Sequence, residues 1–348
     1  MTSYASTSTL QSAWRLLLQE QPNIRARDAA TYLKVSEAEL VACRLGEESI
    51  RLRPEWKLLL GALANLGEVM ALTRNEHCVH ERRGCYRELS VAANGRMGLV
   101  VSADIDLRLF LSGWSYAFAV DEPTVRGTLR SLQIFDRQGI AIHKVYLSGT
   151  SDLAAWELLK ARFCEEVQSA KLDLDELPAK AEPHADSGID IDALKAGWAA
   201  LKDTHHFHAL LQNLNVARTQ ALRLVGSEWA HSLPVTSLPH ALELAAAREV
   251  PIMVFVGNRH CIQIHTGPVS NLAWRDSWFN VLDPAFNLHL QTTGVSELWL
   301  VRKPSVDGLI TSLEAFSAEG ELVVQLFGAR KPGQPELMAW SQLAESLR

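Results

Sequence analysis

The sequence predicts an α+β protein built from two similar halves, each with a large antiparallel sheet flanked by helices. Three observations support this fold class. A long stretch of sequence is repeated in one order, each copy opens and closes with helical patterns, and short β-rich segments fill the interval between them. The repeated unit is far longer than the roughly 20–50 residues of a solenoid repeat, so it indicates paired domains.

The repeat is visible when the sequence is compared with itself at one offset. Val35 faces Val216, and 216 − 35 = 181. The other matches fall in the same order: 33–36 with 214–217, 67–69 with 248–250, Pro123 with Pro304, 131–135 with 312–316, Gly139 with Gly320, and, at an offset of 183, 75–78 with 258–261. This pattern indicates a duplication. We therefore expect an N-terminal repeat over 1–170, an exposed Pro- and acid-rich linker over 171–191, and a C-terminal repeat over 192–348.

Each copy is expected to begin with helices, continue through hairpins and close with a helix. Ser36 precedes one of the helical segments as an N-cap, and residues 136–139 have the composition of a hairpin turn. The expected helices are 13–20, 28–33, 37–44 and 153–168 in the first copy, and 335–347 in the second. The expected strands are 97–104, 106–110, 115–120, 128–135 and 140–147 in the first copy, and 310–316 and 321–327 in the second.

Composition narrows the class of protein. The 348 residues are 47% hydrophobic and carry a net charge of −6, which argues against nucleic-acid binding driven by bulk positive charge. No apolar run approaches the ~18 residues of a membrane span, and the Ser/Thr-rich start lacks the pattern of a secretory signal. The 5 cysteines include no C-x-x-C pair, which favours reduced thiols. We expect a cytoplasmic protein without membrane insertion.

Three histidines within four residues, His205, His206 and His208, are the most informative feature of the chain. If one helix runs through this segment, an apolar face recurs at spacings of 4, 3, 4 and 3 along Leu194, Trp198, Leu201, His205 and His208. Imidazoles on such a face need a partner, which could be a metal, a cofactor iron or an internal hydrogen bond. The first copy has no histidine here, so the cluster belongs to function more than to the shared fold.

Other polar motifs allow two interpretations each. His77 and His80 have a zinc-like spacing, but residues three apart on a strand point to opposite faces, which favours a strand end or a cavity wall. Arg108 and His289 face each other across the repeat and interrupt leucines, so each lies on a solvent face or in a cavity. The segment 325–332 is either a solvated loop or an anion clamp.

Several motifs in order resemble one known family, the cytoplasmic haem-binding proteins of bacterial haem-uptake operons (hemin-degrading factor, HemS/ChuS/PhuS type). The resemblance spans nearly the whole chain, including its two-copy layout. The motifs that carry it are 66–69, 73–76, 79–81, 105–110, 203–205 and 325–334.

The resemblance implies a haem cleft formed largely by the second half. It identifies His205 as the proximal iron ligand, His208 as an alternate ligand and Arg108 as a distal group contributed by the first half. Phe327 stands where the family has a tyrosine, so it can pack on the porphyrin but cannot donate a hydroxyl hydrogen bond. The implied polar edge consists of Arg218, Lys303, Gln325 and Arg330.

Two functions follow from this resemblance. The first is a carrier that accepts imported haem from an inner-membrane importer and delivers it to a haem oxygenase. The second is an enzyme that cleaves haem oxidatively to release iron, with Arg108 stabilising the reacting oxygen. Both need the same pocket, and we favour the carrier, as a monomer or a homodimer. His206 is the least committed of the three histidines, because it lies about 100° away from His205 on a helix.

Overall fold

The structure is a computed structural model that describes residues 7–22, 24–177, 185–331 and 333–348. The chain divides into two compact units. Unit 1 comprises Met1–Thr73, Glu81–Pro178 and Asn258–Ile262, and unit 2 comprises Arg74–His80, Ala179–Gly257 and Gln263–Arg348. Each unit thus includes a short segment from the other copy of the repeat. Residues 178–184 of the expected linker lie outside the described residues.

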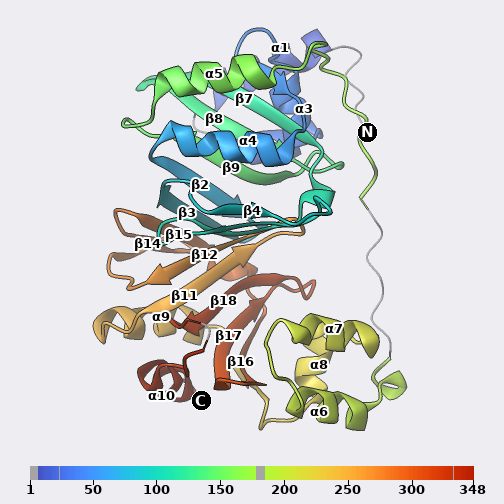
Figure 1. Cartoon of the computed structure of the whole chain (residues 1–348), viewed down its shortest axis with the longest axis vertical. Helices are drawn as coiled ribbons and strands as arrows, with labels where there is room; N and C mark the ends of the chain where they lie inside the picture. Colours follow the sequence, from blue (N-terminus) through green and yellow to red (C-terminus); the bar gives the residue numbers. More distant parts are fainter. Residues whose placement is uncertain (1–6, 23, 178–184, 332) are drawn as a thin grey trace. The chain divides into compact units, whose positions relative to one another are not determined.

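Unit 1 is built on an antiparallel sheet with helices on both faces (Figure 1). Its strands follow the order β1 (Ser49–Leu52), β7 (Tyr116–Thr124), β8 (Gly127–Phe135), β9 (Ala141–Leu147) and β2 (Val69–Arg74). A smaller group contains β6 (Asp106–Leu109), β5 (Gly98–Val101) and β4 (Leu89–Val91). The helices are α1 (Thr7–Glu20), α2 (Ala26–Leu33), α3 (Glu37–Ala42), α4 (Trp56–Ala62) and α5 (Leu153–Phe163).

Unit 2 repeats this plan. Its strand order is β10 (Ala230–Leu233), β16 (Glu297–Ser305), β17 (Gly308–Phe316), β18 (Leu322–Gly328) and β11 (Ile252–Gly257), with a smaller group of β15 (Phe286–Gln291), β14 (Trp278–Leu282) and β13 (Leu272–Arg275). Its helices are α6 (Ile191–Ala199), α7 (His206–Asn213), α8 (Arg218–Leu224), α9 (Ser237–Ala247) and α10 (Met338–Glu345). Strands β3 (Cys78–Gly84) and β12 (Cys261–Gly267) each have residues in both units. The α+β class is confirmed.

The strand register confirms the duplication. Ser131 pairs with Tyr146 in unit 1, and Ser312 pairs with Phe327 in unit 2. Both members of the pair shift by the same amount, since 312 − 131 = 181 and 327 − 146 = 181. The offset found in the sequence therefore relates residues that occupy the same place in the two sheets.

Alternation along the strands of unit 2 divides its core in two. Leu298, Leu300 and Leu313 pack on one face of the sheet with residues of α9 and α10. Trp299 and Val301 point to the opposite face, where they pack with α6, α7 and α8, the group seen together in Figure 1. This second face positions the candidate site.

The helix expected through the histidine segment is interrupted. Helix α6 ends at Ala199 and α7 begins at His206, so the continuous apolar face does not exist. The reason is local, because the Asp203 carboxylate accepts a hydrogen bond from the His205 backbone N–H at 2.9 Å and turns the chain. Phe207 takes the buried position instead, and all three histidines are exposed.

Ser36 is the N-cap of α3, as predicted, and it forms a capping box with Glu39. Its Oγ accepts from the Glu39 backbone N–H at 3.2 Å, and the Glu39 carboxylate accepts from the Ser36 backbone N–H at 2.8 Å. In the second copy the same position is Ala217, which has no side-chain cap.

We expect Ser36→Ala to lower the free energy of unfolding by about 1 kcal/mol, because a helix N–H loses its acceptor. The reverse change, Ala217→Ser, should raise it slightly. Urea unfolding of each variant and of the parent protein measures these free energies. A lower stability of Ala217→Ser would contradict the prediction that residue 217 occupies the same N-cap position as Ser36.

No helix among the described residues is long and apolar enough to cross a membrane. The five cysteines, all within the described ranges, are free thiols. Burial raises the pKa of the Cys261 thiol to about 12, so this thiol is unreactive near neutral pH.

Candidate functional site

His205 stands at the start of α7 with its side chain 85% exposed. Its Nδ1 lies 2.7 Å from Oδ1 of Asp203. The pKa of Asp203 is lowered, first by the hydrogen bond from the His205 backbone, so Asp203 is a carboxylate that can only accept. Nδ1 therefore donates to Asp203. In the neutral tautomer with its proton on Nδ1, the lone pair is on Nε2, which is the arrangement of a metal-ligating histidine with a carboxylate behind it.

The sheet face beside α6–α8 carries a half-buried apolar floor. The register puts Gln325 opposite Phe255 and Phe327 opposite Met253, so all four side chains share one face. The rings of Phe255 and Phe327 meet edge to face with centroids 5.0 Å apart. None of the four is fully buried, so this surface can receive a flat apolar ligand.

On the same face, Arg218, Lys303 and Glu314 form a group that we call the Glu314 cluster. Glu314 is completely buried, and Arg218 donates to its Oε2 from Nε at 3.0 Å and from Nη2 at 2.7 Å. Lys303, also buried, donates from Nζ to the other oxygen, Oε1. Two cations and one carboxylate leave a net charge of +1, and Arg218 keeps 30% of its side chain exposed.

The pKa values of the Glu314 cluster follow from this arrangement. Burial opposes the charge of Glu314, but Arg218 and Lys303 together outweigh it and lower the pKa to about 2. Burial is also the largest influence on Lys303, and with repulsion from Arg218 it outweighs the attraction of Glu314 and lowers the pKa to about 8. The cluster therefore keeps its net positive charge at neutral pH.

Phe207 connects the Glu314 cluster to the histidine segment. Lys303 Nζ lies 4.5 Å from the centre of the Phe207 ring, and the Arg218 guanidinium carbon lies 5.3 Å from it. The ring also meets Trp198 edge to face at 4.7 Å. Glu314 pairs with Gln325 across β17 and β18, so the Glu314 cluster lies beside the apolar floor, and the His205 backbone is two residues before Phe207.

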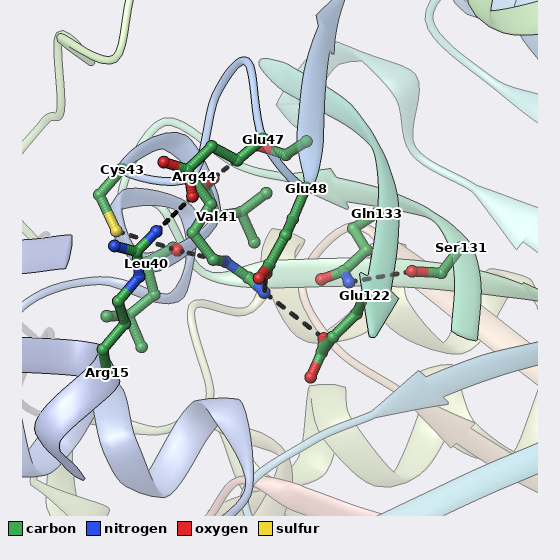
Figure 2. A network of polar contacts seen from close by, with 11 residues as sticks. Arg15, Leu40, Val41, Cys43, Arg44, Glu47, Glu48, Glu122, Ser131 and Gln133 are labelled. Atoms are coloured by element: carbon green, nitrogen blue, oxygen red, sulfur yellow. Dashed lines mark hydrogen bonds and ion pairs between the residues drawn. The ribbon is translucent and has the colours of Figure 1, made fainter. Parts of the chain in front are cut away.

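The equivalent place in unit 1 has different chemistry. At the offset of 181, Glu122 replaces Lys303 and Gln133 replaces Glu314. Figure 2 shows Arg44 reaching Glu48 at 2.9 Å and Glu122 at 3.5 Å, with Gln133 donating to Ser131 at 3.0 Å. The Glu314 cluster is therefore specific to the second copy, as the histidines are.

Arg108 lies in β6 of unit 1, where it donates to the Asp106 carboxylate and keeps 30% of its side chain exposed. Burial raises the pKa of Asp106, although Arg108 opposes this. The equivalent residue of unit 2, His289, has its Nδ1 2.7 Å from Oδ1 of Asn280. Arg108 is thus held by a neighbour and still reachable.

Arg330 follows the end of β18 and is engaged with Asp307, to which it donates from Nη2 at 2.7 Å. His208 is exposed on α7. His77 and His80 lie in unit 2, where His77 Nδ1 is 3.2 Å from Gln291 and the His80 ring packs on Phe286. Within the described ranges, no three His, Cys, Asp or Glu side chains gather into a metal site.

A family model described as the haemin-degrading HemS.ChuX domain matches the chain twice, at residues 34–163 and 215–347. The chain belongs to this family. The two matches begin 181 residues apart, since 215 − 34 = 181, which is the offset of the repeat. The family resemblance predicted from the motifs is confirmed.

This HemS.ChuX family member is similar to several named proteins. The chain is 42% identical to the hemin transport protein HemS of Yersinia enterocolitica, over 92% of each chain. It resembles the crystal structure of holo-PhuS, a heme-binding protein from Pseudomonas aeruginosa, with a TM-score of 0.97 and 62% identity over 99% of each chain. It also resembles the Escherichia coli O157:H7 heme degrading enzyme ChuS, with a TM-score of 0.91 and 36% identity over 98% of this chain and 99% of that one.

The sequence alone assigned no role to three acidic residues that organise the site: Asp203, Asp307 and Glu314. Glu314 had a visible signal, because it is a charge within an apolar strand at a position where the first copy has the neutral Gln133. Asp203 precedes the histidines by two residues, the spacing at which a carboxylate turns back on its own chain. Asp307 is one of many acidic turn residues, and its pairing with Arg330 has no local signal.

Proposed function

We propose that this protein binds haem on unit 2 and acts as a cytoplasmic haem carrier. It accepts imported haem from an inner-membrane importer and delivers it to a haem oxygenase. The observation that carries the proposal is His205, whose Nε2 is exposed and whose Nδ1 is held by Asp203. Similarity to HemS, a hemin transport protein, and to PhuS, a heme-binding protein, supports the same conclusion.

The residues present fit a haem group. One imidazole is enough for the iron, because the porphyrin already supplies four nitrogens. Phe327, Phe255 and Gln325 offer the half-buried face on which a porphyrin can lie. The net positive charge of the Glu314 cluster, with Arg218 partly exposed, favours a propionate nearby, while Lys303 acts from beneath as a buried charge.

Exposure of His205 suits a carrier. A ligand at the surface can reach incoming haem directly, and His208, also exposed on α7, is available as an alternate during release. In this proposal Arg108 supplies a polar group on the distal side. Bound haem would supply the redox chemistry of its iron, and the chain's own residues hold and orient it.

The second candidate function is oxidative haem cleavage, favoured by the likeness to ChuS, described as a heme degrading enzyme. The carrier and the enzyme are distinguished by incubating the purified, ferric-haem-loaded protein with a physiological reductant and catalase. We expect no release of carbon monoxide when haem oxygenase is absent, and transfer of intact haem to haem oxygenase when it is added. Stoichiometric carbon monoxide and a linear tetrapyrrole from the protein alone would overturn the carrier assignment.

A further inference from the structure

The segment that carries His205 is tied to a distant hairpin of unit 2. Residues 200–205 lie between α6 and α7, outside regular helix. Within this segment the carbonyl of Lys202 accepts a hydrogen bond from the backbone N–H of Val306 at 2.9 Å. Val306 belongs to the turn between β16 and β17. The position of the chain just before Asp203 and His205 therefore depends on the position of this turn.

Asp307 fixes that turn from the other side. Its Oδ2 accepts from Arg330 Nη2 at 2.7 Å and from the backbone N–H of Gly333 at 3.1 Å. Its own N–H donates to Ser305 Oγ at 3.1 Å. The side chains of Arg330 and Asp307 are only 19% and 16% exposed. Water screens this ion pair less than an exposed pair, so it contributes more to the stability of the turn.

The placement of Arg330 separates it from the floor of the candidate site. Gln325 and Phe327 share one face of β18, and Gly328 points to the other, where a Cβ would lie 2.8 Å from Trp340. Arg330 comes after the strand has ended, and its Nη2 donates to Asp307. Its observed partners are therefore those of a residue that organises the turn.

We propose that Arg330 is a positioning residue for His205, acting through Asp307 and the β16–β17 turn, and not a direct partner of a haem propionate. The connection runs from Arg330 to Asp307, from the turn to the Lys202 carbonyl, and from there to the imidazole. This inference deepens the proposed function, because it rests on His205 as the haem ligand. It assigns to the segment that follows β18 a role in the geometry of a ligand more than 120 residues earlier (330 − 205 = 125).

Haem dimethyl ester distinguishes the two roles, because its propionates are blocked while its iron and ring are unchanged. We expect Arg330→Gln and Asp307→Asn to speed the dissociation of haem and of its dimethyl ester by the same factor, on the order of 3–10-fold, as for the loss of one hydrogen bond. The double variant should be no worse than either single one. Lys331→Gln is the matched control for loss of a neighbouring cation and should change neither rate.

An effect of Arg330→Gln on haem that disappears with the dimethyl ester would overturn the proposal, since it would show direct contact with a propionate. Dissociation rates that do not change with either ligand would also overturn it. Arg218→Gln, a candidate direct contact, provides the contrast, with an expected loss for haem that is larger than for the ester.

A second measurement needs no haem and separates failure of this inference from failure of the proposed function. In the haem-free protein, Arg330→Gln and Asp307→Asn should speed hydrogen exchange at the Val306 amide, which donates to Lys202. Unchanged exchange would refute the connection whether or not haem binds. If exchange at Val306 is faster but His205→Ala does not change the haem affinity, the connection from Arg330 to the His205 segment is supported. The same result would refute His205 as the haem ligand.

Discussion

Replacing His205 with alanine will speed haem loss by at least about 100-fold and shift the Soret band of the ferric complex. The variant removes the exposed Nε2 that Asp203 holds in its ligating form through Nδ1. The porphyrin then keeps only its contacts with the sheet face and the charge of the Glu314 cluster. Rates of haem transfer to an excess of a haem-scavenging apoprotein, with absorption spectra of each complex, measure both effects.

His206→Ala is the matched control, since it removes an adjacent exposed imidazole and should change the rate by less than about threefold. His208→Ala should have a small effect alone. It should have a larger effect in the His205→Ala background, because His208 is the imidazole left to take over the iron. Equal losses from all three single variants would show that no one histidine is the ligand.

The duplication made most of the fold predictable. A fixed offset relates residues in the same place of two sheets, so hairpins and helices recognised in one copy locate those of the other. The turn at residues 136–139 was predicted from its composition. The Asp136 carboxylate accepts from the backbone N–H groups of Gln138 and Ile140, and Gly139 takes a positive φ of 75°. Helices α4 and α9 were not anticipated, because α4 has only 7 residues, too few to show a helical period, and Pro239 within α9 is typical of a helix break.

The site was predictable in its residue types and less so in its geometry. The histidine segment was found from its composition and from its absence in the first copy. The continuous apolar face that the spacing predicted is absent, since periodicity alone cannot reveal that Asp203 interrupts the helix. The pairing of Arg330 with Asp307 depends on tertiary structure, which brings together residues 23 apart in sequence.

Glu314→Gln will have the largest expected effect on stability. The substitution keeps the shape of the side chain and removes its charge, which leaves Lys303 buried and Arg218 partly buried without their carboxylate. Breaking a buried ion pair from one side costs about 3–5 kcal/mol, because the remaining charge has neither water nor a partner. We expect a loss of about 3 kcal/mol in the free energy of unfolding at pH 7, measured by urea denaturation.

The pH dependence has a definite sign. Because the pKa of Glu314 is lowered from an ordinary 4.5 to about 2, its contribution is fully present above about pH 4.5 and is lost as the pH falls towards 2. The difference in stability between the parent protein and Glu314→Gln should therefore shrink across this window. Glu243→Gln is the control, because Glu243 is exposed beside His240 and its loss should cost less than about 0.5 kcal/mol.

A second substitution tests the mechanism of the loss. If unpaired positive charge is the cause, Lys303→Met in the Glu314→Gln background should restore part of the stability, since it removes the most deeply buried cation and leaves a side chain of similar length. Lys303→Met alone should be destabilising, because Glu314 would keep only Arg218. A partial recovery of stability in the double variant would show that burial of an unpaired charge causes the loss. If the losses of the two single variants add in the double variant, the cause is packing beneath Phe207.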